Sequence, residues 1–146
     1  MGKVAFRIFL SGIICMAISY AVNMVSALLT MDFYKDPAYF QVWSKIMMPL
    51  AGPPPWYFMF YSLGFSLIGG LLISTVYYFV KGAFRQKSAV SKGLFYGLLL
   101  ILAAGIPFML SIILIINLPL LLIAGWTITS AAIYLLDGMV IAKLIK

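Results

Sequence analysis

Four apolar stretches, each long enough to cross a lipid bilayer, occupy most of the 146 residues. They run from about Val4 to Leu29, Trp56 to Val80, Leu94 to Ile116 and Leu118 to Ile141. A membrane-spanning helix needs about 20 residues, because the hydrocarbon layer is about 30 Å thick and an α-helix rises about 1.5 Å per residue. The runs are continuous, whereas strands of a membrane β-barrel alternate between lipid-facing and interior residues. The sequence predicts an all-α membrane protein, one domain over residues 1–146, with four transmembrane helices in two hairpins.

The overall composition agrees with a chain that resides in lipid. Hydrophobic residues make up 65% of the chain, charged residues make up 9%, and the mean hydropathy is +1.14. A soluble fold of this length exposes a large share of its residues to water and could not bury so much apolar surface. The lipid bilayer is therefore the first expected partner.

Basic residues are distributed unevenly between the two ends of the predicted helices, and positive residues near helix ends are retained on the cytoplasmic side. One end carries eight of the ten: Lys3, Arg7, Lys81, Arg85, Lys87, Lys92, Lys143 and Lys146. The other end carries two lysines and two aspartates: Lys35, Lys45, Asp32 and Asp36. We expect both termini in the cytoplasm of a bacterium, with the spans in its inner membrane. The net charge of +7 is explained by these juxtamembrane positions and does not indicate nucleic acid binding.

The sequence contains no histidine and a single cysteine, Cys15. It therefore lacks the usual ligand sets for zinc, haem and iron–sulfur clusters, as well as histidine-based catalytic triads. We interpret Cys15 as a small apolar packing residue. We expect no cofactor, no metal site and no catalytic residue.

The connection between the first two spans has an amphipathic pattern of its own. Asp36 followed by Pro37 is typical of a helix start, because Asp accepts hydrogen bonds from free amides and Pro suits the first turn. Apolar residues then recur at helical spacing: Tyr39, Val42, Trp43, Ile46 and Met47. The pattern predicts a short interfacial helix over about 37–48, anchored at the headgroup boundary by Tyr39 and Trp43. The alternative is a lid or partner-docking surface centred on Trp43.

Small or short polar residues recur every four positions along the first two spans. Small residues at this spacing let two backbones approach closely in lipid. The series are Ser11, Cys15, Ser19, Asn23 and Ala27 in the first span, Ser62, Ser66, Gly70 and Ser74 in the second, and Gly93 and Gly97 at the start of the third. We expect the first two spans to pack on each other through their series. A polar-lined pathway is the alternative interpretation.

The third and fourth spans are expected to be antiparallel neighbours, because the connection around Asn117 is too short for anything else. Pro107, inside the third span, removes one intrahelical hydrogen bond and predicts a kink. The kink is interpreted as part of the helix shape, with a gate as the alternative.

Asp137 lies inside the fourth span, one to two turns from its predicted cytoplasmic end. A carboxylate in hydrocarbon costs about 2.5 to 3.5 kcal/mol on insertion scales, so it should face protein or water and find a partner. Arg7 is the first candidate for an ion pair, and coupling to a proton or cation is the alternative. The candidate polar and ion-pair residues are Asp137, Arg7, Tyr134, Ser130 and Asn23.

The order of these features resembles a group of small bacterial four-helix integral membrane proteins with no assigned function. The residues that carry the resemblance are Asn23, Trp43, Lys92-Gly93-Leu94, Tyr96-Gly97, Pro107, Asn117, Pro119 and Trp126. The resemblance implies a four-helix fold and no particular activity.

Two functions remain open at this point. The first is a non-enzymatic accessory, structural or assembly subunit that packs against other membrane subunits or further copies of itself. The alternative is a small oligomeric transporter or channel with a polar site at Asp137, Tyr134 and Ser130. A membrane enzyme is a remote third, because Asp137 has no second ionisable group at a spacing that suggests a catalytic couple.

Overall fold

A computed structural model describes residues 2–50 and 54–146, and these residues form helices and turns without a strand. The long helices are α1 (Gly2–Leu29), α3 (Phe58–Val80), α4 (Ala89–Leu100), α5 (Ile106–Ile115) and α6 (Leu120–Leu144). A π-helical segment, η3 (Ile101–Gly105), joins α4 to α5, and the connections contain α2 (Met31–Lys35), η1 (Pro37–Tyr39) and η2 (Lys81–Ala83). In this part of the chain four helical spans are long and apolar enough to cross a membrane. The predicted all-α, four-span fold is confirmed.

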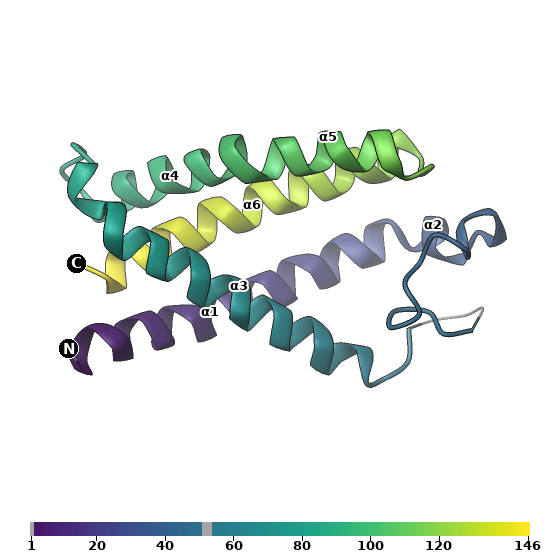
Figure 1. The fold of residues 1–146 in the computed structure, drawn as a ribbon, viewed down its shortest axis with the longest axis horizontal. Helices are drawn as coiled ribbons and strands as arrows, with labels where there is room; N and C mark the ends of the chain where they lie inside the picture. Colours follow the sequence, from purple (N-terminus) through teal and green to yellow (C-terminus); the bar gives the residue numbers. More distant parts are fainter. Residues whose placement is uncertain (1, 51–53) are drawn as a thin grey trace.

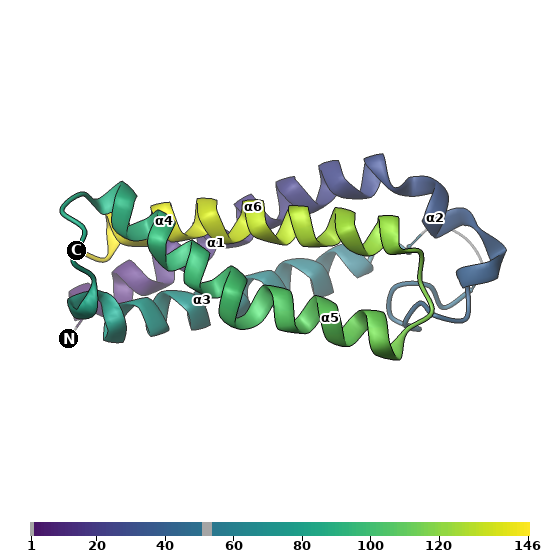
Figure 2. The same cartoon turned by 90° about the horizontal axis from the view of Figure 1, so that it is seen from above.

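The two chain ends lie at one end of the molecule, together with the connection between α3 and α4 (Figure 1). This end carries the larger set of basic residues, and we call it the basic end. The segment that contains α2 lies at the opposite end, which we call the loop end (Figures 1 and 2). Helix α6 contacts α4 and α1, whereas α3 packs mainly on α1 and crosses it. The two hairpins, α1 with α3 and α4–α5 with α6, are therefore joined along α1 and α6.

The third span begins earlier than the sequence predicts, at Ala89 instead of Leu94. Ser88 has an extended backbone, and its hydroxyl accepts a hydrogen bond from the Ser91 amide at 3.0 Å. Such an N-cap satisfies one of the free amides at a helix start. Lys92 therefore lies inside the helix. The fourth span also ends later than predicted, at Leu144 instead of Ile141.

The regular hydrogen bonding of the third span is interrupted just before Pro107. In η3 the amide of Ile106 donates to the carbonyl of Ile101, five residues earlier, and Pro107 occupies the first turn of α5. Proline has no N–H and its ring crowds the carbonyl four residues before it, so a wider π-turn relieves the conflict. The disturbance predicted at Pro107 thus falls on residues 101–105.

The continuous interfacial helix predicted over 37–48 does not form. Asp36 caps η1 as expected, with Oδ1 accepting from the Ala38 amide at 2.9 Å, but the helix ends at Tyr39 and turns follow. Ser44 Oγ accepts from the Met47 amide at 3.2 Å, a local hydrogen bond that competes with helical pairing. Helices this short are also marginal without packing along one face.

The apolar side chains of this connection pack on the protein at the loop end. Tyr39 and Trp43 contact the cluster that contains buried Leu122. Trp126 Nε1 donates a hydrogen bond to the Tyr34 hydroxyl at 2.9 Å, and the ring centroids of Tyr34 and Trp43 are 4.9 Å apart. The structure therefore places the two predicted headgroup anchors, Tyr39 and Trp43, against the end of the α5–α6 hairpin.

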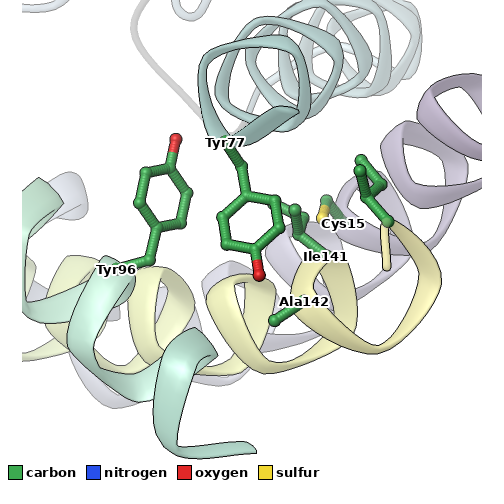
Figure 3. Packing of buried hydrophobic residues seen from close by; sticks show 6 residues of the cluster. Cys15, Tyr77, Tyr96, Ile141 and Ala142 are labelled. Carbon is green, nitrogen blue, oxygen red and sulfur yellow. The ribbon is translucent and has the colours of Figure 1, made fainter. Parts of the chain in front are cut away.

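All four spans contribute to a second buried cluster towards the basic end (Figure 3). Tyr77 of α3 and Tyr96 of α4 have ring centroids 5.1 Å apart. The Tyr96 hydroxyl donates to the Ile73 carbonyl at 2.6 Å, as expected of a buried tyrosine that needs a polar partner. This cluster holds α3 close to α4 and α6 near the basic end.

Candidate functional site

Helices α1 and α3 approach each other closely at the members of the two small-residue series that lie nearer the basic end. A Cβ added to Gly70 would lie 2.9 Å from the Gly12 carbonyl oxygen and 3.0 Å from Cys15 Cβ. The hydroxyls of Ser11 and Ser74 are hydrogen-bonded at 2.8 Å, and both side chains are fully buried. Two members of each predicted series therefore form the crossing, Ser11 and Cys15 in α1 and Gly70 and Ser74 in α3.

Ser19 and Asn23 of the first series and Ser66 of the second face a cleft. Beyond the crossing, α3 and α1 diverge towards the loop end (Figures 1 and 2), and a cleft of about 260 Å³ lies between α1, α3 and α6. It is lined by Ser19, Asn23, Ser66, Gly69, Gly70, Ile73, Ser130, Ile133, Tyr134 and Asp137. Six of these ten residues have polar side chains. Ser62, one turn further along α3 than Ser66, is half-buried and does not line the cleft.

Asp137 is the acidic residue of this cleft. Its side chain is 2% exposed, and its Oδ1 atom has no hydrogen-bond partner among the described residues. The Cys15 thiol of α1 lies beside the carboxyl group. A buried polar atom without a partner is unfavourable by several kcal/mol in an apolar medium, so such an atom in a folded protein calls for an explanation.

The structure does not bring Arg7 to Asp137. Arg7 is exposed, and it lies eight residues, about 12 Å along α1, from the Cys15 that contacts Asp137. The two residues were predicted at similar depth in the membrane because the predicted fourth span ended at Ile141. Since α6 continues to Leu144, Asp137 lies about one turn deeper than predicted. Neither lysine nor arginine is among the residues that line the cleft in the described chain.

Glycine contacts between α4 and α6 fix the orientation of Asp137. A Cβ on Gly93 would collide with the Gly138 carbonyl, and a Cβ on Gly97 would lie 2.5 Å from the Tyr134 carbonyl oxygen. Gly93 and Gly97 thus form the packing series predicted for the third span. Their partner is α6, where Gly138 is part of the contact surface. This packing role of Gly138 was not predicted from the sequence. The available signal was a small residue next to Asp137 in the same turn of the helix.

Tyr134 and Ser130 line the cleft and also face η3 on the other side of α6. Both border a small cavity of about 10 Å³ next to Gly105, and a Cβ on Gly105 would lie 3.3 Å from the Tyr134 ring. Asn23 is exposed at the part of the cleft towards the loop end. Sequence analysis did not find the hydrogen bond of 2.8 Å between Thr129 and Ser26, which joins α6 to α1.

The chemistry available in the cleft is one carboxyl group among hydroxyls, an amide and apolar side chains. Within residues 2–50 and 54–146 no group of three or more His, Cys, Asp or Glu could hold a metal ion. The length and composition of the four spans define an integral, multi-pass membrane protein. The chain has no significant match among protein-family models, curated proteins or solved structures, so no family is identified.

Proposed function

We propose that this membrane protein is non-enzymatic and binds a cation in the cleft at Asp137, as a small transporter or channel does. The observation that carries the proposal is the buried Asp137 carboxyl, whose Oδ1 atom is unpaired by the described residues and which lines a polar cleft within the spans. Ionisable residues inside membranes are paired with one another or mark the path of an ion or substrate. Since Arg7 lies elsewhere, the second case applies to Asp137.

The electrostatics of the lining favour a positive ligand. Asp137 contributes the formal charge, while Ser19, Ser66 and Ser130 contribute oxygen atoms that can accept hydrogen bonds. An apolar surrounding strengthens the attraction between a carboxylate and a cation relative to water. Acid–base catalysis usually needs a second titratable group near the first, and the described residues near Asp137 offer the Tyr134 phenol and the Cys15 thiol, two weak acids, for that role.

We also propose that the basic end faces the cytoplasm of a bacterial inner membrane. The eight basic residues at this end support that orientation through their preference for the cytoplasmic side. The cleft then extends from the Asp137 level towards the outer face.

Solid-supported-membrane electrophysiology on proteoliposomes tests cation binding. Concentration jumps of sodium, potassium or alkylammonium chloride should give a transient current with the wild-type protein, because charge enters the membrane when a cation reaches Asp137. The Asp137→Asn protein should give no current above that of protein-free liposomes. Absence of a current for every cation with the wild-type protein would contradict the proposal.

A second candidate is the accessory or assembly subunit, alone or as a homo-oligomer. The observation that favours it is an exposed aromatic surface at the loop end of α3. Trp56, just before α3, is 77% exposed, and Phe60 and Phe65 in α3 are also exposed. Large aromatic side chains are enriched at protein interfaces. Purification in gentle detergent should then yield a partner at fixed stoichiometry that is lost in Phe60→Ala/Phe65→Ala and retained in Leu114→Ala, a control on the exposed side of α5.

A further inference from the structure

We infer that the ligand of the cleft is a small organic ammonium ion that carries a second polar group. Its positive end contacts Asp137, and its polar group reaches the hydroxyls further along the cleft. This inference rests on the proposed cation binding and specifies the class of cation.

The positive charge follows from the surroundings of Asp137. Its Oδ1 atom is buried without a partner in the described chain, and the residue lines a cleft that has neither lysine nor arginine among its described lining residues. A primary ammonium group has three N–H donors and no acceptor, so it matches a carboxylate oxygen that has no hydrogen-bond partner. Hydrogen bonds between charged groups are stronger than those between neutral groups.

The volume of the cleft suits a molecule more than a single ion. A water molecule takes up about 30 Å³ in the liquid, so a cleft of about 260 Å³ has room for several atoms beyond one cation. Pockets for drug-sized ligands begin at about 300 Å³. The ligand is therefore smaller than a typical drug and larger than a bare ion.

The lining combines apolar and polar side chains. Gly70, Ile73 and Ile133 offer apolar contact. Ser19 and Ser66 each lie four residues from the crossing residues Cys15 and Gly70, which is about 6 Å further along α1 and α3. A short alkyl chain can lie against the apolar side chains while a hydroxyl or amine at its far end meets the serines.

A bare metal cation fits this distribution less well. Sodium and potassium lose their hydration shells favourably where several oxygen atoms surround one point, as in carbonyl-lined filters. In this cleft the side-chain oxygens are spread along the helices, and two isoleucines line the cleft with them. These apolar side chains match the carbon atoms of an organic ammonium ion.

The same chemistry can come from a free amine or from the headgroup of an aminophospholipid. Both present an ammonium group on a short alkyl chain with oxygen atoms beyond it. The test therefore includes membranes with and without phosphatidylethanolamine.

The test measures the thermal unfolding midpoint of the purified protein in phosphatidylcholine nanodiscs. A ligand that binds the folded state raises this midpoint with concentration. We expect aminobutanol to raise it in a saturable manner, butylamine to do so with lower affinity, and uncharged butanediol to have no effect. The apparent Kd of aminobutanol should weaken at least about tenfold in Asp137→Asn, because a charged hydrogen bond is lost.

A steric variant keeps the inference testable if Asp137→Asn does not fold. Gly69 lines the cleft, and a Cβ added there meets nothing within 4 Å, so Gly69→Leu should fill the cleft without displacing a helix. Gly64, on the same helix and equally unobstructed, is outside the lining. Gly69→Leu should weaken aminobutanol binding at least about tenfold, and Gly64→Leu should leave it unchanged.

The outcomes separate the inference from the proposed function. If sodium or potassium raises the midpoint through Asp137 and aminobutanol does not, the ammonium inference is wrong and cation binding stands. If no cation raises it in either membrane, both are wrong. If phosphatidylethanolamine raises it through Asp137 and free aminobutanol does not, the ammonium class is supported and its source is the lipid headgroup.

Discussion

Gly93 of α4 and Gly138 of α6 lie in mutual backbone contact, so that a Cβ on either residue would collide with the carbonyl group of the other. Asp137 precedes Gly138 and therefore projects about 100° around α6 from this contact, towards Cys15 of α1 and the cleft. The close packing of α6 on α4 thus fixes the rotation of α6, and that rotation directs the carboxyl into the cleft.

Adding one methyl group to this contact should destabilise the fold. We expect Gly138→Ala to lower the free energy of unfolding in detergent by about 1 to 3 kcal/mol, the usual range for overpacking. Gly64→Ala is the matched control, because its Cβ meets nothing within 4 Å and alanine is the better helix former. Equal stability of the two variants would contradict the packing described for α4 and α6.

Replacement by leucine should change the free energy of unfolding at one of two neighbouring glycines of α3 and not at the other. Gly70→Leu forces a side chain against Gly12 and Cys15, so we expect it to separate α1 from α3 and to destabilise the protein by about 1 to 3 kcal/mol or more. Gly69→Leu points into the cleft and should leave the unfolding free energy nearly unchanged. Equilibrium unfolding of both variants under one condition makes the comparison, and a destabilised Gly69→Leu with an unaffected Gly70→Leu would refute it.

The loop end should depend on Trp43. Trp43→Ala removes the ring that packs between Tyr34 and Trp126, whose ring centroids lie 4.9 and 6.2 Å from that of Trp43. We expect faster amide hydrogen exchange over residues 31–48, because local stability follows local packing, and little change in α6. Trp56→Ala is the control, since Trp56 is largely exposed. Unchanged exchange over 31–48 in Trp43→Ala would show that this docking does not hold the segment.

The orientation of the chain can be measured with single cysteines in a Cys15→Ser background. Lys35 and Lys87 are exposed and lie in the connections at the loop end and the basic end. We expect Lys35→Cys to react with an impermeant thiol reagent added outside intact cells, and Lys87→Cys to react after permeabilisation. The reverse pattern would overturn the proposed cytoplasmic location of the termini.

The fold could be predicted from the sequence because apolar length and continuity depend on local composition. The four spans follow from that signal. The observed end of a span differs from the predicted one where a single capping residue sets it, as Ser88 does for α4. The connection after α2 was predicted less well. The spacing of its apolar residues is helical, but the Ser44 side chain competes locally for the backbone amide of Met47. The packing of Trp43 on the hairpin is a tertiary contact, which residue spacing does not predict.

The candidate site could be predicted in its residues but not in its geometry. Of the predicted polar candidates, the structure brings Asp137, Ser130, Tyr134 and Asn23 to one cleft and leaves Arg7 outside it. Ser19, predicted as a packing residue, also lines this cleft. Which members of each four-residue series pack and which line the cleft depends on where α1 and α3 cross. That point is set by Gly12, Gly70 and the Ser11–Ser74 pair, through contacts between helices far apart in sequence.

Attraction of cations into the cleft by Asp137 can be measured through charge-selective modification of a cysteine inside the cleft. Ser66→Cys in a Cys15→Ser background places a thiol on the cleft wall. We measure the ratio of its modification rates with a cationic and an anionic methanethiosulfonate reagent, first with Asp137 present and then in Asp137→Asn. We expect a ratio at least about tenfold higher with Asp137 present, since about 1.4 kcal/mol of electrostatic attraction corresponds to that factor. Equal ratios in the two proteins would contradict it.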